Sequence, residues 1–395
     1  MNDEIGKFYD RHPYPPPVTD LDYYAQAWSD GTRRRVDHHL LWPTRPFRDE
    51  LDILVAGCGT SQAVKYALRY PLSRVVGIDV SRASLEHSRG LAERYDVDNL
   101  TLTRLELEQV GELGREFDYI VCTGVLHHLR DPVQGLAALG GVLAPDGALN
   151  AMVYARYGRT GVYMIQEYCR LLGIGTAPEE LRDLMETLKE MPLGHPLRTL
   201  LGSSPEFSDG DALADALLNP RDRAYSVPEV FDLMAGGGLS FGRWLRQAPY
   251  TPSCGLIASV PHADLVSGLG LRDQYTAVEL FRGTMTRHSF LAYQTAGHQH
   301  LEPFSEPQAA GYVPIRPETV IAVYERLPPG ASAALLNQAH EFSDLVMFVD
   351  EAEKRVFEAI DGVRPLRALP GGDVDVGVFV RRLFDHDLVV IDASR

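Results

Sequence analysis

The sequence has few cysteines, and they lie far apart. Cys58, Cys122, Cys169 and Cys254 form no CxxC pair, which excludes a zinc ribbon and predicts reduced thiols. No apolar run approaches the roughly 18 residues that a membrane span needs. The N-terminal segment MNDEIGKFYDRHPYPPP has no apolar centre for a signal peptide. We therefore expect a cytoplasmic protein with no membrane partner.

Basic residues are scarce relative to acidic ones. The chain has 38 Lys and Arg against 54 Asp and Glu, a formal net charge of −16. A nucleic-acid partner requires a basic face to meet the phosphate backbone, so this balance argues against one. With 395 residues, 45% of them hydrophobic, the chain can bury a substantial core and form two or three domains.

Strands and helices alternate from residue 51 onward. Five apolar runs predict strands: DILVAG, SRVVGID, NLTLTRL, FDYIVCTG and GALNAMVYA. The segments SQAVKYALRY, SRASLEHSRGLAERY (with Ser81 as N-cap) and DPVQGLAALGGVL predict helices between them. This order is typical of an α/β fold with right-handed crossovers and a parallel sheet. A later pair, SFGRWLRQ and CGLIASV (254–260), has too short a link for a parallel crossover and predicts an antiparallel hairpin at the end of the sheet.

Three other regions surround this alternation. Residues 1–50 combine the extended PYPPP with a helix predicted in DLDYYAQAW, and we interpret them as an N-terminal cap segment. Residues 155–222 form a helical insertion after the fifth strand, with amphipathic helices predicted in RTGVYMIQEYCRLLG and PEELRDLMETLKEM. The second helix has an apolar stripe that needs a partner surface, either as a lid over a ligand pocket or on a second copy of the chain in a homodimer. The stripe consists of Leu181, Leu184, Met185 and Leu188.

The composition changes again near residue 262. HSFLAYQ has the alternating residue pattern of a strand, and several prolines lie within 303–317. The tail predicts two helices and a final strand. We interpret 51–261 as a ligand-binding domain. Residues 262–395 are interpreted as a small C-terminal accessory domain of α+β type, with a winged-helix fold as one form of it.

The strongest chemical signal is the glycine-rich turn in ILVAGCGTSQ. Gly57, Cys58 and Gly59 follow the first strand, so the backbone can approach a ligand closely at the carboxyl edge of the sheet. Asp79 ends the second strand, 22 residues past Gly57. An acid there is placed to accept hydrogen bonds from both ribose hydroxyls of an adenosine. Glu106 follows the third strand and could border the adenine.

Four segments resemble successive motifs of class I S-adenosylmethionine-dependent methyltransferases, of the UbiE or methyltransferase type 11/12 kind. They are ILVAGCGTSQ, VVGIDVS, FDYIVCTGVLHHLRDP and LAPDGAL. The resemblance covers about residues 50–155, and the reversed last strand of that fold extends it to about 261. It implies a Rossmann-like, doubly wound, mostly parallel seven-stranded sheet with an antiparallel last strand. The C-terminal domain loosely resembles the regulatory tails of some bacterial methyltransferases.

The resemblance implies S-adenosylmethionine as the cofactor. Gly57 and Gly59 would pass close to its methionine part, Asp79 would bind the ribose, Glu106 would face the adenine, and 123–126 would line the methyl side. The cofactor-binding residues expected on this basis are Ala56, Gly57, Cys58, Gly59, Asp79, Val80, Glu106, Leu107, Thr123 and Gly124.

Three positions near the turn depart from related patterns. Val55 stands where the methyltransferase family usually has an acid, and Ser61 stands where it has the final glycine of the loop. Both differences affect how the methionine carboxylate and ammonium would be held. Gln62 stands where the dinucleotide fingerprint has its third glycine. That glycine permits the close helix–strand packing of a pyrophosphate site. A nicotinamide oxidoreductase is thereby disfavoured, and the turn is predicted to hold a sulfonium nucleoside.

His127 and His128 follow the fourth strand, beside the expected methyl group. Either could accept a proton from a nucleophile at neutral pH, which makes them the candidate catalytic residues. The alternative is a structural loop in which one histidine bonds the backbone and the other packs on the cofactor. No carboxylate or cysteine lies at ligand spacing from a histidine pair, so no metal is expected.

The expected reaction is in-line displacement at the methyl carbon, with S-adenosylhomocysteine leaving. The expected acceptor is an oxygen or nitrogen nucleophile of a small molecule. A peptide or protein acceptor is one alternative, and a non-catalytic, cofactor-sensing regulatory protein is another. We expect the insertion and the segment FYDRHPYPPP to close the acceptor pocket. The candidates for its aromatic wall are Tyr9, Tyr14, Tyr154, Tyr157 and Tyr163.

Overall fold

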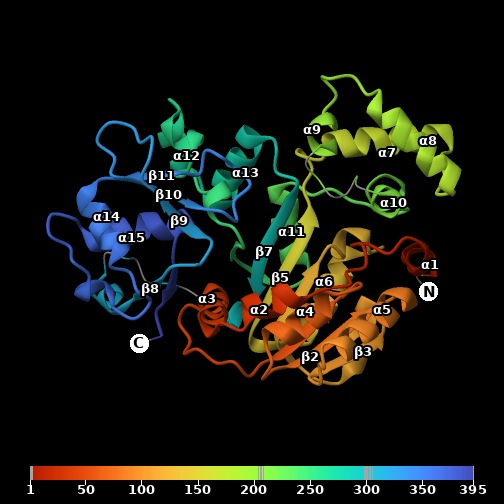
Figure 1. Ribbon diagram of the computed structural model, residues 1–395, viewed down its shortest axis with the longest axis horizontal. Helices are drawn as coiled ribbons and strands as arrows, with labels where there is room; N and C mark the ends of the chain where they lie inside the picture. The colour runs from red at the N-terminus through yellow and green to blue at the C-terminus, as the bar shows by residue number, and fades with distance from the viewer. Residues whose placement is uncertain are drawn as a thin grey trace.

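A seven-stranded sheet with the order β3-β2-β1-β4-β5-β7-β6 organises most of the chain in the computed structural model (Figure 1). Residues 3–394 are described, apart from 203, 205, 206, 208, 298–300, 302, 303 and 305. The strands are β1 (Asp52–Ala56), β2 (Arg74–Asp79), β3 (Leu100–Arg104), β4 (Phe117–Thr123), β5 (Leu143–Tyr154), β6 (Ser240–Trp244) and β7 (Arg287–Tyr293). The first five are parallel, and β7 is antiparallel to both β5 and β6. The predicted Rossmann-like sheet with a reversed last strand is confirmed.

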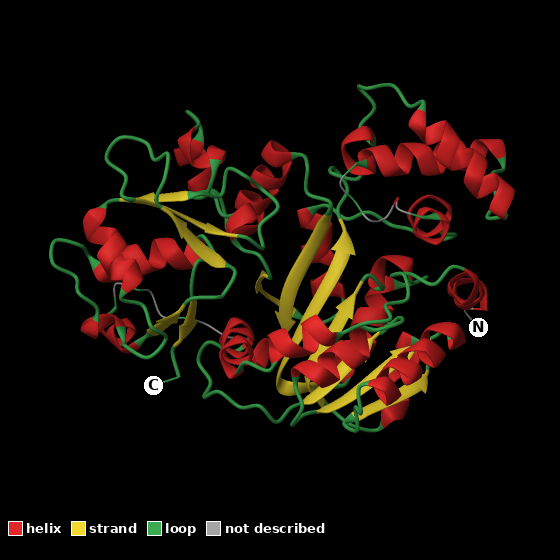
Figure 2. Ribbon diagram, viewed as in Figure 1, coloured by secondary structure: helices red, strands yellow, loops and turns green. Residues whose placement is uncertain are grey.

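Helices cover both faces of this sheet (Figure 2). Along β1, Leu54 packs into one hydrophobic core, while Ile53 and Val55 pack into the core on the opposite face. Successive side chains of a strand point to opposite faces, so a central parallel strand is apolar throughout. The helices on the Leu54 side are α6 (Pro132–Gly141), α11 (Val227–Gly236) and α13 (Leu271–Arg282). Those on the other side are α3 (Gly31–Leu41), α4 (Gln62–Arg69) and α5 (Arg82–Arg94).

The seventh strand lies elsewhere than the sequence predicts. Residues 254–260 contain a 3₁₀ turn at Leu256–Ser259 in place of the predicted strand. The true partner of β6 is β7, within the HSFLAYQ segment that was interpreted as part of the accessory domain. The connection is long because it contains α12 (Ala263–Ser267) and α13, and Val278 of α13 joins the same core as Leu54. The sheet domain therefore continues to the end of β7 and does not stop at residue 261.

The insertion has a hydrophobic core of its own. The two predicted helices are confirmed as α7 (Thr160–Leu172) and α8 (Pro178–Lys189), followed by α9 (Arg198–Leu201) and α10 (Gly210–Leu218). Leu184 and Leu188 pack in this core, and Leu181 meets Phe8 of α1 (Asp3–Arg11). The stripe meets α10, a helix that the sequence analysis missed, so its partner surface lies within the insertion and not over the pocket.

The C-terminal module is α+β, as predicted. Two small antiparallel sheets, β11-β10-β9 and β12-β8, share one core with the helices α14 and α15. The elements are β8 (Val313–Ile315), β9 (Val320–Val323), β10 (Ala333–Asn337), β11 (Met347–Val349), α14 (Glu351–Glu358), α15 (Val376–Asp385) and β12 (Val390–Asp392). The tail is thus helix, helix and strand, in the predicted order.

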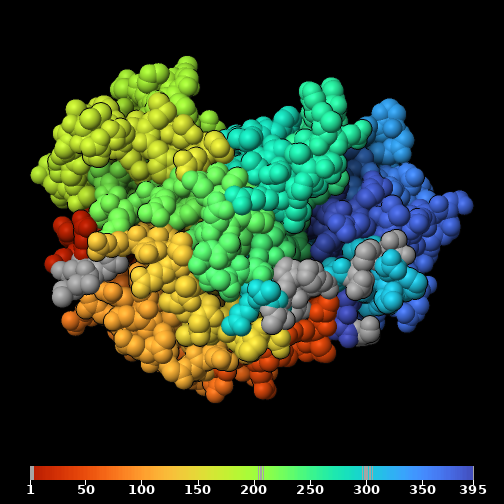
Figure 3. Space-filling model, turned by 180° about the vertical axis from the view of Figure 1, so that it is seen from behind, coloured from red at the N-terminus to blue at the C-terminus, as the bar shows by residue number. Residues whose placement is uncertain are grey.

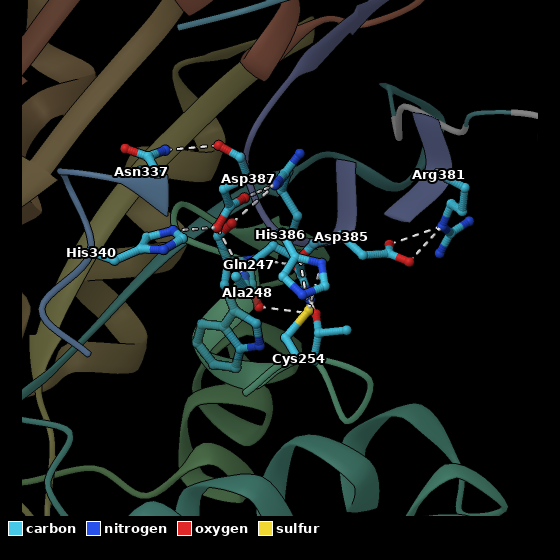
Figure 4. A network of polar contacts seen from close by, with 12 residues as sticks. Gln247, Ala248, Cys254, Asn337, His340, Arg381, Asp385, His386 and Asp387 are labelled. Atoms are coloured by element: carbon cyan, nitrogen blue, oxygen red, sulfur yellow. Dashed lines mark hydrogen bonds and ion pairs between the residues drawn. The ribbon is translucent and has the colours of Figure 1, made fainter. Parts of the chain in front are cut away.

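Asp387, in the turn after α15, joins this module to the sheet domain (Figure 4). Its carboxylate accepts hydrogen bonds from Arg243 of β6 (2.8 Å), from the N–H of Ala248 (2.8 Å) and from His340 (3.2 Å). Its carbonyl accepts a bond from Asn337 of β10 (2.7 Å). One buried acid therefore connects four segments of the chain.

The N-terminal segment contacts the C-terminal module through α3. Arg35 donates to the Asp392 carboxylate (3.0 Å) and to the Gly362 carbonyl (2.6 Å). The N–H of Ala393 donates to the carbonyl of Pro43 (2.7 Å).

The predicted helix in DLDYYAQAW is confirmed as α2 (Asp22–Trp28). Among the described residues, no helix combines the length and the apolar character needed to cross a bilayer.

Candidate functional site

A cavity of about 910 Å³ lies where the strands β1, β2 and β4 end. Its walls come from the turn after β1, from Asp79 and Val80 after β2, and from Thr123 to Val125 after β4. Other walls come from the N-terminal segment and the insertion, which lie next to each other at one end of the molecule (Figure 3). This is the carboxyl edge of the parallel sheet, where doubly wound folds bind their ligands.

The turn after β1 requires its glycines. Gly57 and Gly59 have φ values of +69° and +54°, in the left-handed region. A Cβ atom on Gly57 would lie 2.2 Å from Cγ2 of Val125, so no side chain fits there. The N–H groups of Gly57 and Cys58 donate to the carbonyl of Ile78 at 2.8 and 2.9 Å. The turn is thereby held against β2, with its glycine backbone facing the cavity.

Asp79 is fixed by backbone donors at the floor of the cavity. Its Oδ2 accepts the N–H of Gly59 (2.8 Å) and its Oδ1 accepts the N–H of Ser81 (2.8 Å). Burial raises the pKa of this carboxyl, while the backbone hydrogen bonds oppose the shift. Since each carboxylate oxygen has two lone pairs, both can accept a further hydrogen bond from a ligand.

Most of the residues predicted to bind the cofactor line this cavity. They are Gly57, Cys58, Gly59, Asp79, Val80, Leu107, Thr123 and Gly124. Ala56 does not, because its side chain belongs to the hydrophobic core below the turn. Glu106 does not line it either; it precedes the 3₁₀ turn Leu107–Leu113, and Glu108 of that turn lines the cavity.

Other cavity residues were missed by the sequence analysis. Gln62 was noted only as a replaced glycine, yet it lines the cavity and its Nε2 donates to Oγ1 of Thr123 (2.7 Å). Its position at the start of α4, directly after the glycine turn, is a signal that could have indicated it. Met152 of β5 also lines the cavity but carries no such signal.

The two candidate histidines have different surroundings. His128 lines the cavity, and its Nδ1 bonds the carbonyl of Arg221. A carbonyl only accepts, so Nδ1 carries a proton, and in the neutral ring Nε2 has the lone pair. His127 is buried outside the lining, with its ring 4.2 Å from the Tyr154 ring. Burial, with His128 and Arg159 nearby, lowers the pKa of His127 well below its ordinary value, so this ring is neutral.

A carboxylate lies beside the histidine pair, contrary to the reasoning from sequence spacing. The ligand atoms of His127, His128 and Asp222 lie within 4.8 Å of one another. Spacing could not show this, because Asp222 comes from the far end of the insertion. Gln166 donates to Asp222 (2.8 Å), and Arg159 lowers the Asp222 pKa that burial raises. Nearby His128 and Arg159 thus oppose the effect of burial on this carboxyl group, and we assign no metal to the cluster.

The N-terminal segment and the insertion meet over the cavity. The hydroxyl of Tyr9 donates to Oδ1 of Asp215 on α10 (2.8 Å), and His12 contacts Asp211 of the same helix (2.8 Å). The hydroxyl of Thr60, in the glycine turn, donates to the Pro15 carbonyl (3.2 Å). Of the five tyrosines expected in an aromatic wall, three line the cavity and two do not. Those that do are Tyr9, Tyr14 and Tyr154; those that do not are Tyr157 and Tyr163.

The C-terminal module also reaches the cavity. Arg287, the first residue of β7, and Glu341, in the loop after β10, both line it and form an ion pair with each other. The module therefore contributes to the wall of the site, in addition to packing against the sheet domain. No sequence pattern indicated this role for Glu341.

Comparison with known proteins finds similarity to methyltransferases. Residues 54–149 match the family described as "Methyltransferase domain". The chain is 29% identical over 303 residues to an uncharacterised protein, syc1184_c, of Synechococcus sp., covering 72% of this chain and 70% of that one. It is 34% identical to trans-aconitate 2-methyltransferase of Deinococcus radiodurans over 34% of this chain and 49% of that protein.

Solved structures share the fold over nearly the whole chain. The structure of PKMT2 from Rickettsia typhi in complex with AdoHcy aligns with a TM-score of 0.63 at 17% identity, covering 96% of this chain and 77% of that one. The alignment thus includes the insertion and the C-terminal module as well as the sheet domain. At this identity the likeness concerns the fold.

Proposed function

Because this chain is a class I S-adenosylmethionine-dependent methyltransferase, we propose that it methylates an oxygen or nitrogen nucleophile of a small molecule held in the cavity. The observation that carries the proposal is the continuity of this cavity. It runs from the glycine turn and Asp79 to His128 and Tyr154, and the N-terminal segment and the insertion border it. A partly enclosed volume of about 910 Å³ has the size of a small-molecule site with room for a cofactor and an acceptor.

The residues in the cavity fit S-adenosylmethionine, the cofactor of this family. The two oxygens of Asp79 suit the ribose hydroxyls, and the bare backbone of Gly57 and Gly59 suits the methionine part. Leu107 and Glu108 border the place for the adenine, and Thr123 to Val125 border the methyl group. When bound, this cofactor supplies a methyl group on a positively charged sulfur, which makes the methyl carbon electrophilic.

The chain's own contribution to the reaction is alignment, exclusion of water and proton removal. Tyr9, Tyr154 and Met152 border the acceptor and keep it on the methyl side. Alignment of this kind accounts for much of the rate of a bimolecular displacement. His128 lines the cavity, and Nε2 of its neutral ring takes the proton of the nucleophile, while the Arg221 carbonyl holds the ring in place.

Replacing His128 by alanine should lower turnover by less than about 100-fold and change the affinity for S-adenosylhomocysteine by less than about threefold, because alignment carries most of the rate. Steady-state kinetics and isothermal titration measure the two effects. His127→Phe is the matched control, since it replaces a buried neutral ring that does not line the cavity. A loss of turnover of about 10⁴-fold with binding intact would show that proton removal by His128 accounts for most of the rate.

Residues 155–222 should exchange amide hydrogens faster than β1 and β2 in the free protein, and more slowly once S-adenosylhomocysteine is bound. A lid must open to admit ligands, and moving elements come from the less stable parts of a fold. The bond between Tyr9 and Asp215 links the lid to the N-terminal segment that borders the site. Hydrogen exchange with mass spectrometry measures this, with α14 as an internal reference. Exchange as slow as that of β1, with no response to the ligand, would make the insertion a fixed element.

Turnover tests the proposed function as a whole. S-Adenosylhomocysteine and NADH should be compared by calorimetry, and S-adenosylhomocysteine should bind while NADH should not. Release of S-adenosylhomocysteine should then be measured with a panel of small molecules and with peptides. Methylation of peptides alone would replace the small-molecule acceptor by a peptide or protein acceptor.

A further inference from the structure

One buried acid in the cavity has only neutral partners. Asp215 on α10 is 2% exposed and lines the cavity. Its Oδ1 accepts hydrogen bonds from the Tyr9 hydroxyl (2.8 Å) and from Nδ2 of Asn219 (3.0 Å). Within the described part of the chain, Asp215 has no ion pair and its Oδ2 has no hydrogen bond. An ionised carboxylate is unfavourable in such a place unless a positive charge compensates it.

Three cationic side chains line the cavity, namely Lys65, Arg159 and Arg287. Arg287 forms its ion pair with Glu341. Arg159 lies over the ring of Tyr154 (3.6 Å) and lowers the pKa of Asp222 through its charge. Within the described part of the chain no ion pair joins any of the three to Asp215, whose charge is therefore available to a ligand.

Aromatic side chains line the cavity together with Asp215. The ring centres of Tyr9 and His128 are 6.2 Å apart, and those of His128 and Tyr154 are also 6.2 Å apart. The faces of tyrosine rings attract cations, and this attraction adds to that of a carboxylate. Tyr9 takes part in both features, since its hydroxyl bonds Asp215 and its ring lies beside His128.

We propose that the methyl acceptor is an amine, bound as its ammonium form by Oδ2 of Asp215 and the ring of Tyr9. This inference rests on the proposed function and specifies its substrate class. The ammonium loses a proton to Nε2 of His128, and the freed nitrogen lone pair forms a bond to the methyl carbon. The bond between that carbon and sulfur breaks, its electron pair stays on sulfur, and His128 returns the proton to water. The product is the methylated ammonium.

A binding experiment tests the ammonium site without requiring turnover. The protein saturated with S-adenosylhomocysteine is titrated with benzylamine, benzyl alcohol and benzoate, which share a ring and differ in charge. We expect benzylamine to bind at least about tenfold more tightly than the other two, which corresponds to about 1.4 kcal/mol. Equal binding of the three probes, or preference for benzoate, would overturn the proposal.

Variants then locate the site. Asp215→Asn keeps an acceptor for Tyr9 and should weaken benzylamine binding at least about tenfold, while S-adenosylhomocysteine binds within about threefold of wild type. Asp183→Asn removes the same charge at an exposed position of α8, outside the cavity lining, and should change neither affinity. Tyr9→Phe keeps the ring and should retain the preference for the amine. Unchanged benzylamine binding in a folded Asp215→Asn protein would overturn the proposal.

Turnover separates this inference from the proposed function. If benzylamine binds through Asp215 but neither amines nor other acceptors are methylated, the ammonium site stands and the proposed reaction fails. If phenols or carboxylic acids are methylated and amines are not, the reaction stands and the amine acceptor is wrong. A lysine-containing tripeptide, compared with benzylamine, shows whether the amine belongs to a peptide.

Discussion

Replacing Asp79 by alanine should weaken the binding of S-adenosylhomocysteine by about 2–4 kcal/mol, a ~30- to ~900-fold rise in Kd. The variant loses an acceptor for both ribose hydroxyls. It also frees the N–H groups of Gly59 and Ser81, which the carboxylate holds at 2.8 Å. Isothermal titration measures the change. Asp98→Ala, at an exposed position before β3, is the control for the loss of one negative charge.

The pH dependence gives a second test of Asp79. Burial raises its pKa, so the acid becomes protonated at a higher pH than an ordinary carboxyl group. The ionised form is the better acceptor, and cofactor affinity should therefore fall as the pH drops through the raised pKa. Asp79→Asn cannot titrate and should lack this component. Unchanged affinity in a folded Asp79→Ala protein would remove Asp79 from the cofactor site.

Replacing Asp387 by alanine should lower the free energy of unfolding by about 3–5 kcal/mol, the cost of leaving a buried charge without its partner. The variant leaves Arg243 of β6 without its acid, and it leaves the N–H of Ala248 and the ring of His340 without an acceptor. The side chains of Arg243 and Asp387 are 16% and 8% exposed, so water replaces these contacts poorly. Urea unfolding followed by circular dichroism measures the change.

Two further variants interpret that result. Asp373→Ala removes an exposed acid before α15 and should change stability by less than about 0.5 kcal/mol. Asp387→Asn keeps the shape of the side chain and tolerates the φ of +55° at this position, so its loss should be smaller. A loss below about 1 kcal/mol in Asp387→Ala would mean that the C-terminal module is held to the sheet domain mainly by other contacts.

The parallel half of the sheet could be predicted because its signals are local. Each strand from β1 to β5 is an apolar run, and two of the helices between them, α5 and α6, have capped starts. The hydroxyl of Ser81 accepts the N–H of Ser84 (3.1 Å), and Asp131 accepts the N–H of Gln134 (3.0 Å). The position of β7 could not be predicted in this way. HSFLAYQ has the alternation of a strand, but strand pairing depends on which surfaces are left uncovered, and α13 had to be recognised first as part of the same core.

The same distinction applies to the site. Gly57, Asp79 and Thr123 could be predicted, because the carboxyl ends of parallel strands meet at one edge of the sheet. Asp215 and Glu341 could not, since they come from segments placed over that edge only by packing between the insertion, the N-terminal segment and the C-terminal module. Neither residue lies in a motif, and the chemistry assigned to Asp215 follows from its burial and its partners.

The contact between α3 and β12 has a consequence for how the chain folds. Arg35 and Asp392 are separated by 357 positions, so their contact has one of the highest loop-closure entropies in the molecule. Strands β1 to β5 can pair through short crossovers long before this contact forms. We therefore expect a folding intermediate in which the sheet exists and the N-terminal segment is not yet tied to the C-terminal module. The tie between α3 and the C-terminal module must therefore wait until the ribosome has translated β12, although the sheet that holds the site can form earlier.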